Sequence, residues 1–328
     1  MPLGQGPFFD ELAIGQEFAG APAVTLTDGL AAAHQAITGD RLALALDHEL
    51  CQEVTGGGPL APPALVWDLA IGQSTIVTQH VRANLFYRGL AFRRLPVLGD
   101  TLRTRTRVVA LRQNRPRPGR APTGLAALRI TTADQEGRPV LDFWRCAMLP
   151  LRDNETETGH ADDLDRIGED APPPRFEALV SGWRLERFAA RTAGPRPAEL
   201  HGRRAIQVAG GDVVSSAPEL ARLTLNVAAV HHDAQAGGGD RLVYGGHAIG
   251  VALSQATRAL PSLVTVVGWH ACHHLGPVRE NDTLRSTVTI ERADELAGGA
   301  MVHLRSLVRA DGSPDRDVLD WRYVAVLA

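Results

Sequence analysis

The sequence predicts an α+β protein built from two similar halves. In each half a long apolar stretch, at residues 63–73 and 246–260, precedes several segments in which apolar and polar residues alternate. One helix followed by consecutive strands, with no helices between them, is typical of an antiparallel sheet rather than of parallel βαβ units. Landmarks of the first half recur about 180 residues later, which indicates a duplicated domain.

Two pairs of segments carry this repeat. Residues 95–103 read LPVLGDTLR and residues 276–285 read GPVRENDTLR, and alternating residues follow each of them. The last strand of each half reads VLDFWR at 140–145 and VLDWR at 318–322. These pairs predict that both halves end in the same set of strands.

The segment between the halves, residues 153–174, is acidic and ends in three prolines. Such a composition predicts a linker that packs on no core. We therefore expect an N-terminal domain at 1–152 and a C-terminal domain at 175–328.

Composition excludes several classes of function. The net charge of the 328 residues is -3, which gives no basic surface for nucleic acid. All 34 basic residues are arginine, so Schiff-base chemistry, a pyridoxal phosphate aldimine and a Walker A lysine are excluded. Three cysteines without CxxC spacing argue against a disulfide scaffold or a zinc knuckle: Cys51, Cys146 and Cys272. Because no signal peptide or membrane-length apolar run is found, we expect a cytoplasmic protein.

The most informative segment, residues 223–247, reads LTLNVAAVHHDAQAGGGDRLVYGGH. It places an amide and an imidazole five residues apart, at Asn226 and His231. A Gly-rich loop follows, and YGGH at 244–247 then opens the second apolar helix. The first N–H groups of a helix lack intrahelical partners and carry partial positive charge, so this start favours a developing oxyanion.

Each of these residues also has a structural interpretation. Asn226 and His231 could belong to a turn and a polar loop, and Asp233 could cap that loop or orient a histidine. Gly245 and Gly246 could serve a positive φ or close packing, which is compatible with a functional N–H group. For the Asn and His pair the spacing alone favours the structural interpretation, and the Gly-Gly helix start 19 and 20 residues after Asn226 counts toward a catalytic one.

These motifs and others resemble MaoC-like (R)-specific enoyl-CoA hydratases and dehydratases, and within them the β-methylmalyl-CoA dehydratase (mesaconyl-CoA hydratase) branch. The segments that carry the resemblance are VTLTDGLAAAHQAITGD at 24–40, ANL at 83–85, PVLGDTL at 96–102, NVAAVHHD at 226–233 and RLVYGGH at 241–247. The resemblance covers nearly the whole chain and implies a double hotdog fold. It also implies a hydro-lyase for an enoyl-CoA or 3-hydroxyacyl-CoA thioester with a short, branched or dicarboxylic acyl chain.

Departures from the family pattern place the site in the second half. Members of the family generally carry an Asp and a His five residues apart. The first half keeps Asp40 but has Ala45 five positions later, whereas the second half has His231 but Asn226 at the Asp position. A similar Asn and His pair occurs in β-methylmalyl-CoA dehydratases and in type 2 hydroxyacyl-thioester dehydratases. We expect Asn226 to hold a water and His231 to move its proton, alone or shared with Asp233, while the first half helps to hold the acyl-CoA.

The other predicted site residues surround the thioester. We expect the N–H group of Gly246 to support the enolate oxygen, and the family resemblance places His274 in the pocket. The predicted oxyanion and substrate-binding residues are Tyr244, Gly245, Gly246, His247, Asp233 and His274.

Strand alternation would bring a possible metal-ligand set to one face, namely His270, Cys272 and His274. Hydration of an activated thioester needs no Lewis acid, so we predict no metal, and no cofactor other than the CoA thioester substrate.

Two other functions remain open from the sequence. One is a hotdog acyl-CoA thioesterase, which would use a carboxylate-activated water, and the other is a non-catalytic acyl-CoA-binding protein. The partner in each case is acyl-CoA, without nucleic acid or membrane, and a homodimer is possible. Five arginines could contact CoA phosphates, although a solvated face is the interpretation we favour: Arg93, Arg94, Arg115, Arg117 and Arg120.

Overall fold

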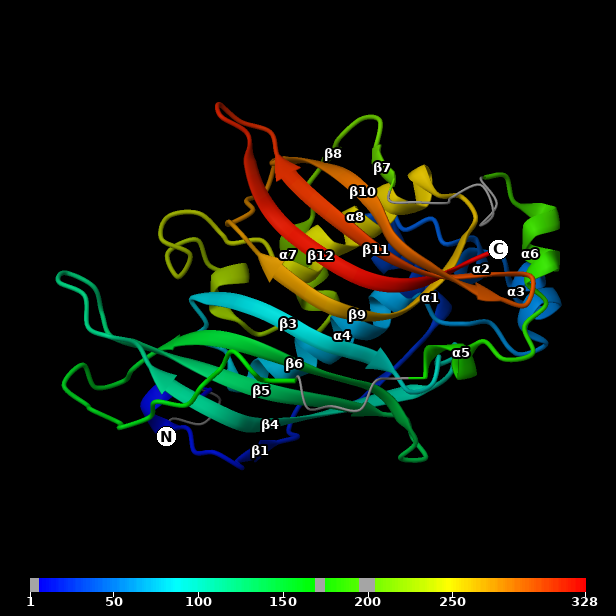
Figure 1. Cartoon of the computed structure of the whole chain (residues 1–328). Coiled ribbons are helices and arrows are strands. Elements are labelled where there is room, and N and C mark those ends of the chain that lie inside the picture. Colours follow the sequence, from blue (N-terminus) through cyan, green and yellow to red (C-terminus); the bar gives the residue numbers. More distant parts are fainter. Residues whose placement is uncertain (1–5, 169–174, 195–203) are drawn as a thin grey trace.

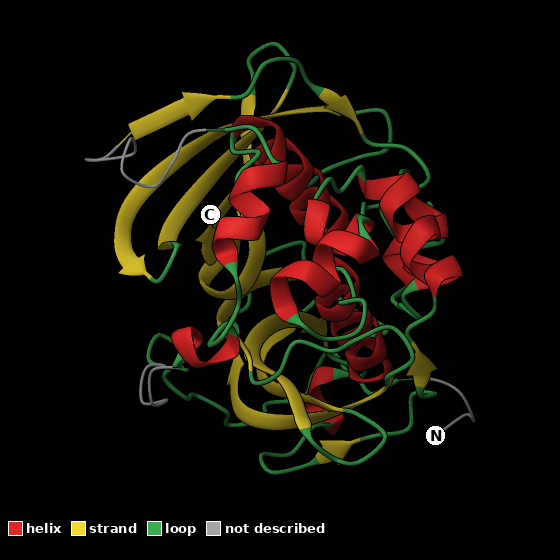
Figure 2. Cartoon of the chain, turned by 90° about the vertical axis from the view of Figure 1, so that its right-hand side faces the viewer, coloured by secondary structure: helices red, strands yellow, loops and turns green. Residues whose placement is uncertain are grey.

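The computed structural model of the chain describes residues 6–168, 175–194 and 204–328. Within these ranges twelve strands form one continuous sheet in the order β1-β4-β5-β6-β3-β9-β12-β11-β10-β7, with β2 beside β4 and β8 beside β10. The sheet curves around the helices, and β3 of the first half lies next to β9 of the second (Figures 1 and 2). The predicted α+β fold, with helices against an antiparallel sheet, is confirmed.

The elements of the first half are the 3₁₀ helix η1 (Phe9–Glu11), β1 (Glu17–Phe18), β2 (Val24–Thr25), α1 (Asp28–Thr38), α2 (Ala43–Leu46), α3 (His48–Thr55), α4 (Pro63–Gln73), the 3₁₀ helix η2 (Ser74–Val77), β3 (Ala83–Phe92), β4 (Thr101–Gln113), β5 (Thr123–Ala133) and β6 (Pro139–Pro150). Those of the second half are α5 (Phe176–Leu179), α6 (Leu185–Arg191), β7 (Arg204–Gln207), β8 (Asp212–Val213), α7 (Ala217–Leu223), the 3₁₀ helix η4 (Ala229–His231), α8 (Gly245–Ala259), β9 (Leu263–His274), β10 (Thr283–Leu296), β11 (Gly299–Ala310) and β12 (Arg316–Leu327).

The two long helices lie inside the curved sheet and share one apolar core. Every residue of α4 is buried, and twelve residues of α8 are buried as well. Pro63 opens α4 at a position where its missing N–H leaves no hydrogen bond unmade. Apolar side chains of both helices and of strands from both halves belong to a single continuous cluster. Among the described helices, none has the length and apolarity needed to cross a membrane.

Equivalent ion pairs show the repeat at the level of side chains. On β6, Asp142 accepts two hydrogen bonds from Arg129 of β5, at 3.1 and 2.8 Å. On β12, Asp320 accepts two from Arg305 of β11, both at 2.8 Å. The two aspartates therefore occupy the same position in the two halves, and the predicted match of the last strands is present in the structure.

The halves interlock through the ends of two helices. The hydroxyl groups of Thr38, at the end of α1, and Thr224, after α7, each donate to the carbonyl four residues earlier. Thr38 packs against α8, where a Cβ at Gly250 would lie 2.7 Å from its Cγ2. Thr224 packs against α4, where a Cβ at Gly72 would collide with its carbonyl. The segment that follows α7 is therefore held against the helix of the first half.

The segment after β6 does pack on the sheet, which differs from the expectation for a linker. Leu164 is only 2% exposed and belongs to an apolar cluster with Phe86 and Cys146. Arg88 donates hydrogen bonds to the carbonyls of this segment, including that of Asp165 at 2.7 Å. Apolar residues scattered in an acidic sequence are sufficient to cover this outer face. The three prolines at 172–174 lie outside the described residues, and the domain boundaries stay a prediction.

Candidate active site

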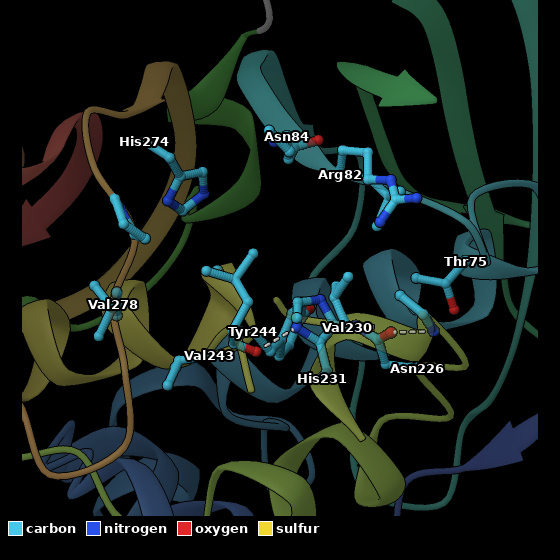
Figure 3. A pocket seen from close by; sticks show the side chains of 18 of the residues that line it. Thr75, Arg82, Asn84, Asn226, Val230, His231, Val243, Tyr244, His274 and Val278 are labelled. Carbon is cyan, nitrogen blue, oxygen red and sulfur yellow. Dashed lines mark hydrogen bonds between the residues drawn. The ribbon is translucent and has the colours of Figure 1, made fainter. Parts of the chain in front are cut away.

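A cavity of about 540 Å³ lies between the two halves. Its walls come from η2, β3 and β6 of the first half, and from the segment after α7, the start of α8 and the end of β9 of the second. Figure 3 shows Asn226, His231 and Tyr244 on one side of this space, with His274 and Arg82 across from them. The predicted catalytic pair therefore lies in one pocket with residues of both halves.

Asn226 lines this cavity and has an amide nitrogen without a hydrogen-bond partner. It follows Leu225, whose φ of 58° turns the chain out of α7. Its Oδ1 accepts the N–H of Ala228 at 3.0 Å, and the next residue, Val227, donates its N–H to Thr75 Oγ1 at 2.9 Å. Because a backbone N–H fixes which amide atom is the oxygen, Nδ2 is the atom left over, and it has no partner. A buried N–H donor without a partner is well suited to hold a water oxygen.

His231 is held in one tautomer. It lies in η4, is 9% exposed, and its Nδ1 is 2.7 Å from the carbonyl oxygen of Leu242. A carbonyl can only accept, so Nδ1 carries the proton and Nε2 keeps its lone pair. Burial lowers the pKa of His231 to about 4, so the imidazole is neutral at neutral pH. It can therefore accept a proton through Nε2.

The start of α8 supplies unpaired N–H groups at the same cavity. No side chain caps this helix, whose N-cap is Tyr244. Gly245, the first helical residue, lines the cavity, and a Cβ there would lie 2.6 Å from His274 Nε2. A side chain at this position would therefore displace the His274 ring, which packs directly on the helix start. The N–H groups of the first turn can polarise a carbonyl oxygen placed beside them.

His274 is the residue on β9 that reaches the cavity. Burial lowers its pKa to about 4, and its ring makes an edge contact with Tyr87, with centroids 5.8 Å apart. Its Nε2 has no hydrogen-bond partner. Like His231, it offers a neutral imidazole to a bound molecule.

Arg145 is a cavity residue that the sequence interpretation missed. It is 3% exposed, and its guanidinium donates to Ser74 Oγ at 2.9 Å and to Thr78 Oγ1 at 2.6 Å. Its Nε has no partner, and within the described residues no carboxylate pairs with it. A buried cation with only hydroxyl partners is costly unless an anion completes its surroundings. Alternation along β6 could have predicted its direction, because Asp142 and Trp144 point to one face of the sheet and Arg145 must then point to the other.

Three predicted residues lie outside the cavity lining. Asp233 is exposed, and its Oδ1 accepts the N–H of Gln235, so it shapes the loop. Gly246 faces α4, where a Cβ on it would collide with Asp68. His247, the next residue along α8, is buried, and neither of its ring nitrogens has a hydrogen-bond partner. The cavity is reached by Tyr244 and Gly245, which makes Gly245 the better candidate for the oxyanion donor.

The expectation that His270, Cys272 and His274 share one face is wrong for His270. The pairing of β9 with β12 shifts register opposite this residue, so a bulge breaks the alternation. His270 is exposed and lies 2.7 Å from His303. In the described part of the chain no three metal-ligating side chains come together.

The loop of the first half that contains Asp40 has the same local geometry as the loop that contains Asn226, but it does not reach the cavity. Asp40 follows the left-handed Gly39 as Asn226 follows Leu225, and its Oδ1 likewise accepts the N–H two residues later, from Leu42. Its other oxygen is buried without a partner, and burial raises its pKa. It is absent from the residues that line the cavity.

Buried aromatic side chains pack at the second-half position that is equivalent to Arg145. Asp142 of β6 and Asp320 of β12 are equivalent. Arg145, three residues after the first, therefore corresponds to Tyr323, three residues after the second. Tyr323 is fully buried and stacks on Trp321 with centroids 3.7 Å apart, and Trp269 contacts Trp321 and Trp67 at 5.6 and 4.9 Å. At the position equivalent to Arg145, the second half thus has a buried aromatic side chain in place of a guanidinium.

The arginines considered for CoA phosphates are not cavity residues. Arg93 pairs with Asp142, and Arg94 pairs with Asp100 and Asp134, so both stabilise the sheet. The other three, Arg115, Arg117 and Arg120, are exposed in the loop between β4 and β5. The two arginines with side chains at the cavity mouth are instead Arg82 and Arg279.

Comparisons with known proteins give the following similarities. No family model matches the chain. It is 27% identical to the mesaconyl-CoA hydratase of Cereibacter sphaeroides, over 93% of this chain and 90% of that protein. It is 26% identical to the beta-methylmalyl-CoA dehydratase of Chloroflexus aurantiacus, over 85% of this chain and 80% of that protein. Among solved structures, a conserved hypothetical protein of Mycobacterium tuberculosis, described as having a double hotdog fold, is 55% identical, with 100% of both chains covered and a TM-score of 0.94.

Proposed function

Because the chain belongs to the double hotdog family of MaoC-like hydratases and dehydratases, we propose that it adds water reversibly to the double bond of an enoyl-CoA thioester. The family resemblance and the double hotdog fold predicted from the sequence are confirmed. The observation that carries the proposal is the meeting of an amide donor, a neutral imidazole and an uncapped helix start at one cavity.

The reaction uses three groups of this chain. Asn226 Nδ2 donates to the oxygen of a water, and His231 Nε2 takes a proton from that water as its oxygen bonds to the β-carbon. The electron pair of the double bond moves to the thioester oxygen, where the N–H of Gly245 supports the enolate. The imidazolium then returns its proton to the α-carbon, and a buried imidazole with a lowered pKa gives up that proton readily. No cofactor enters this scheme.

The buried guanidinium supports a carboxylated acyl chain. Arg145 has three N–H groups left after its bonds to Ser74 and Thr78, and guanidinium binds carboxylates in a fixed fork geometry. A short dicarboxylic substrate such as mesaconyl-CoA would supply the missing anion inside the cavity. We therefore propose that the enzyme prefers an enoyl-CoA whose acyl chain ends in a carboxylate.

The first half supplies the remaining wall. Asn84 and Tyr87 of β3 line the cavity, and Arg82, just before this strand, is exposed at its mouth. Such a guanidinium is suited to the phosphates of CoA. The first half thus holds the substrate, in agreement with the loss of its own site.

A thioesterase is disfavoured by the lining of the cavity. Among the described residues that line it there is no Asp or Glu, so no carboxylate is present to activate a water. An activity assay distinguishes a hydratase from a protein that binds acyl-CoA without turnover.

The test is a panel of enoyl-CoA thioesters that includes mesaconyl-CoA and crotonyl-CoA. A hydratase removes the enoyl absorbance without releasing free thiol, and we expect mesaconyl-CoA to react faster. Thiol release with the enoyl absorbance retained would indicate a thioesterase. Calorimetric binding without turnover of any member would indicate a binding protein.

A further inference from the structure

A buried polar cluster lies behind the cavity, where α1, α4 and α8 meet. His34 of α1 and Asp68 of α4 are both 0% exposed, and His34 Nε2 is 2.9 Å from Asp68 Oδ2. The hydroxyl of Tyr244 is 3.2 Å from Asp68 Oδ1 and 3.2 Å from its carbonyl oxygen. Tyr244 is 2% exposed but lines the cavity, so it links this cluster to the site.

The fold does not require a carboxylate at this position. Gln73 of α4 donates to the carbonyl of Leu102, the second residue of β4, and Gln255 of α8 donates to the carbonyl of Leu284, the second residue of β10. These equivalent hydrogen bonds align the two long helices with an offset of 182 residues. On this alignment the residue equivalent to Asp68 is Gly250. The repeat thus packs well with no acid there, and burial raises the pKa of Asp68, with the hydrogen bond from His34 acting in the opposite direction.

Asp68 contacts the residues on both sides of Gly245. Its carboxyl receives the hydroxyl of Tyr244, the residue before, and it fills the space that a Cβ of Gly246, the residue after, would occupy. Tyr244 in turn makes an edge contact with the His231 ring, with centroids 5.8 Å apart. The helix start that faces the cavity is therefore fixed from behind at two points.

We propose that Asp68 is a positioning residue for the start of α8: anchored by His34, it fixes Tyr244 and Gly246 so that the N–H of Gly245 faces the substrate carbonyl. This inference rests on the proposed function, because it explains how the oxyanion donor is aligned. Misplacing such a group by about 1 Å can lower the rate by roughly 10²-fold.

Three variants separate positioning from stability. In Asp68→Ala the Tyr244 hydroxyl loses its acceptor and a space opens beneath the helix start. In Asp68→Asn an oxygen still accepts from Tyr244, and the amide donates to His34 Nε2 once the ring proton moves to Nδ1, an atom without a partner. Leu128→Ala, on β5, removes a fully buried side chain of the same core and is the control for destabilisation.

The variants are compared at equal folded fraction by steady-state kinetics and by hydrogen exchange of the peptide 243–250. We expect Asp68→Ala to lower kcat roughly 10- to 100-fold with KM changed less than about threefold, and to speed exchange of that peptide. Asp68→Asn should recover most of the loss, and Leu128→Ala should leave kcat and this peptide close to wild type.

Two results would overturn the inference: a kcat of Asp68→Ala no lower than that of Leu128→Ala, or wild-type exchange in the peptide 243–250 of Asp68→Ala. If the wild-type protein hydrates no thioester, the proposed function fails on that result alone. The exchange comparison then decides by itself whether Asp68 orders the start of α8.

Discussion

Replacement of Arg145 by Met tests the assignment of the substrate. The change removes a buried guanidinium and keeps a long unbranched side chain in its place. Ser74 Oγ still donates to the carbonyl of Ile71 at 2.6 Å after the change, so its hydroxyl proton keeps a partner. Replacing a buried charge with an apolar side chain of similar size is often neutral or stabilising, and we expect Arg145→Met to fold.

The expected effect follows from the N–H groups that Arg145 has to offer. Two of its five N–H groups are bonded to hydroxyls, which leaves three for a substrate carboxylate. Removing one partner of a buried charge pair costs about 2–5 kcal/mol, and we take roughly 2–3 kcal/mol because the carboxylate shares the cation with two hydroxyls. At about 1.4 kcal/mol per factor of ten, the loss is roughly 30- to 150-fold.

The assay is the ratio of kcat/KM for mesaconyl-CoA to that for crotonyl-CoA, which lacks the carboxylate. Arg145→Met should lower this ratio by roughly 30- to 150-fold. Arg82→Met is the matched control, because Arg82 lies exposed at the mouth of the same cavity and should affect both CoA esters alike. An unchanged ratio in Arg145→Met, or a wild-type preference for crotonyl-CoA, would refute the assignment.

Three further predictions concern the helix start, the first half and pH. Gly245→Ala places a Cβ 2.6 Å from His274 Nε2, so turnover should fall at least about tenfold; a wild-type rate would locate the oxyanion donor elsewhere. Asp40→Asn should leave turnover within about threefold of wild type, because this residue does not line the cavity; a large fall would reverse the allocation of the two halves. Burial lowers the pKa values of His231, His247 and His274 to about 4 from 6.5, so the unfolded chain binds more protons between these values. The free energy of unfolding should therefore drop as pH falls from 6.5 to 4, and urea midpoints independent of pH over this range would contradict it.

The repeat and the place of Asn226 and His231 at one cavity could be predicted because they depend on local patterns. Alternation and matched segments located the strands of both halves, and the spacing of Asn226 and His231 located the loop that reaches the cavity. The family resemblance supplied the direction of the chemistry. The equivalence of Asp40 and Asn226 is visible in the structure as the same hydrogen bond to the N–H two residues on.

What the sequence could not supply depends on contacts between distant segments. Asp68 was missed because nothing local marks a helix aspartate as buried. Alternation along β6 is a local signal that turns Arg145 inward, but only contacts between distant segments place it at the cavity. Gly246 was expected at the substrate, but the structure directs it to α4, since one further step along a helix turns a residue by about 100°. The bulge at His270 also depends on pairing with a remote strand.

The central claim is that His231 moves the proton while Asn226 holds the water. Its most direct test is the hydration rate and the calorimetric affinity for a non-reacting acyl-CoA in wild type and in His231→Ala. The account predicts a fall in turnover of roughly 10²- to 10⁴-fold with affinity largely kept, because the imidazole acts mainly in the transition state. Hydration by a folded His231→Ala protein at a near-normal rate would contradict it.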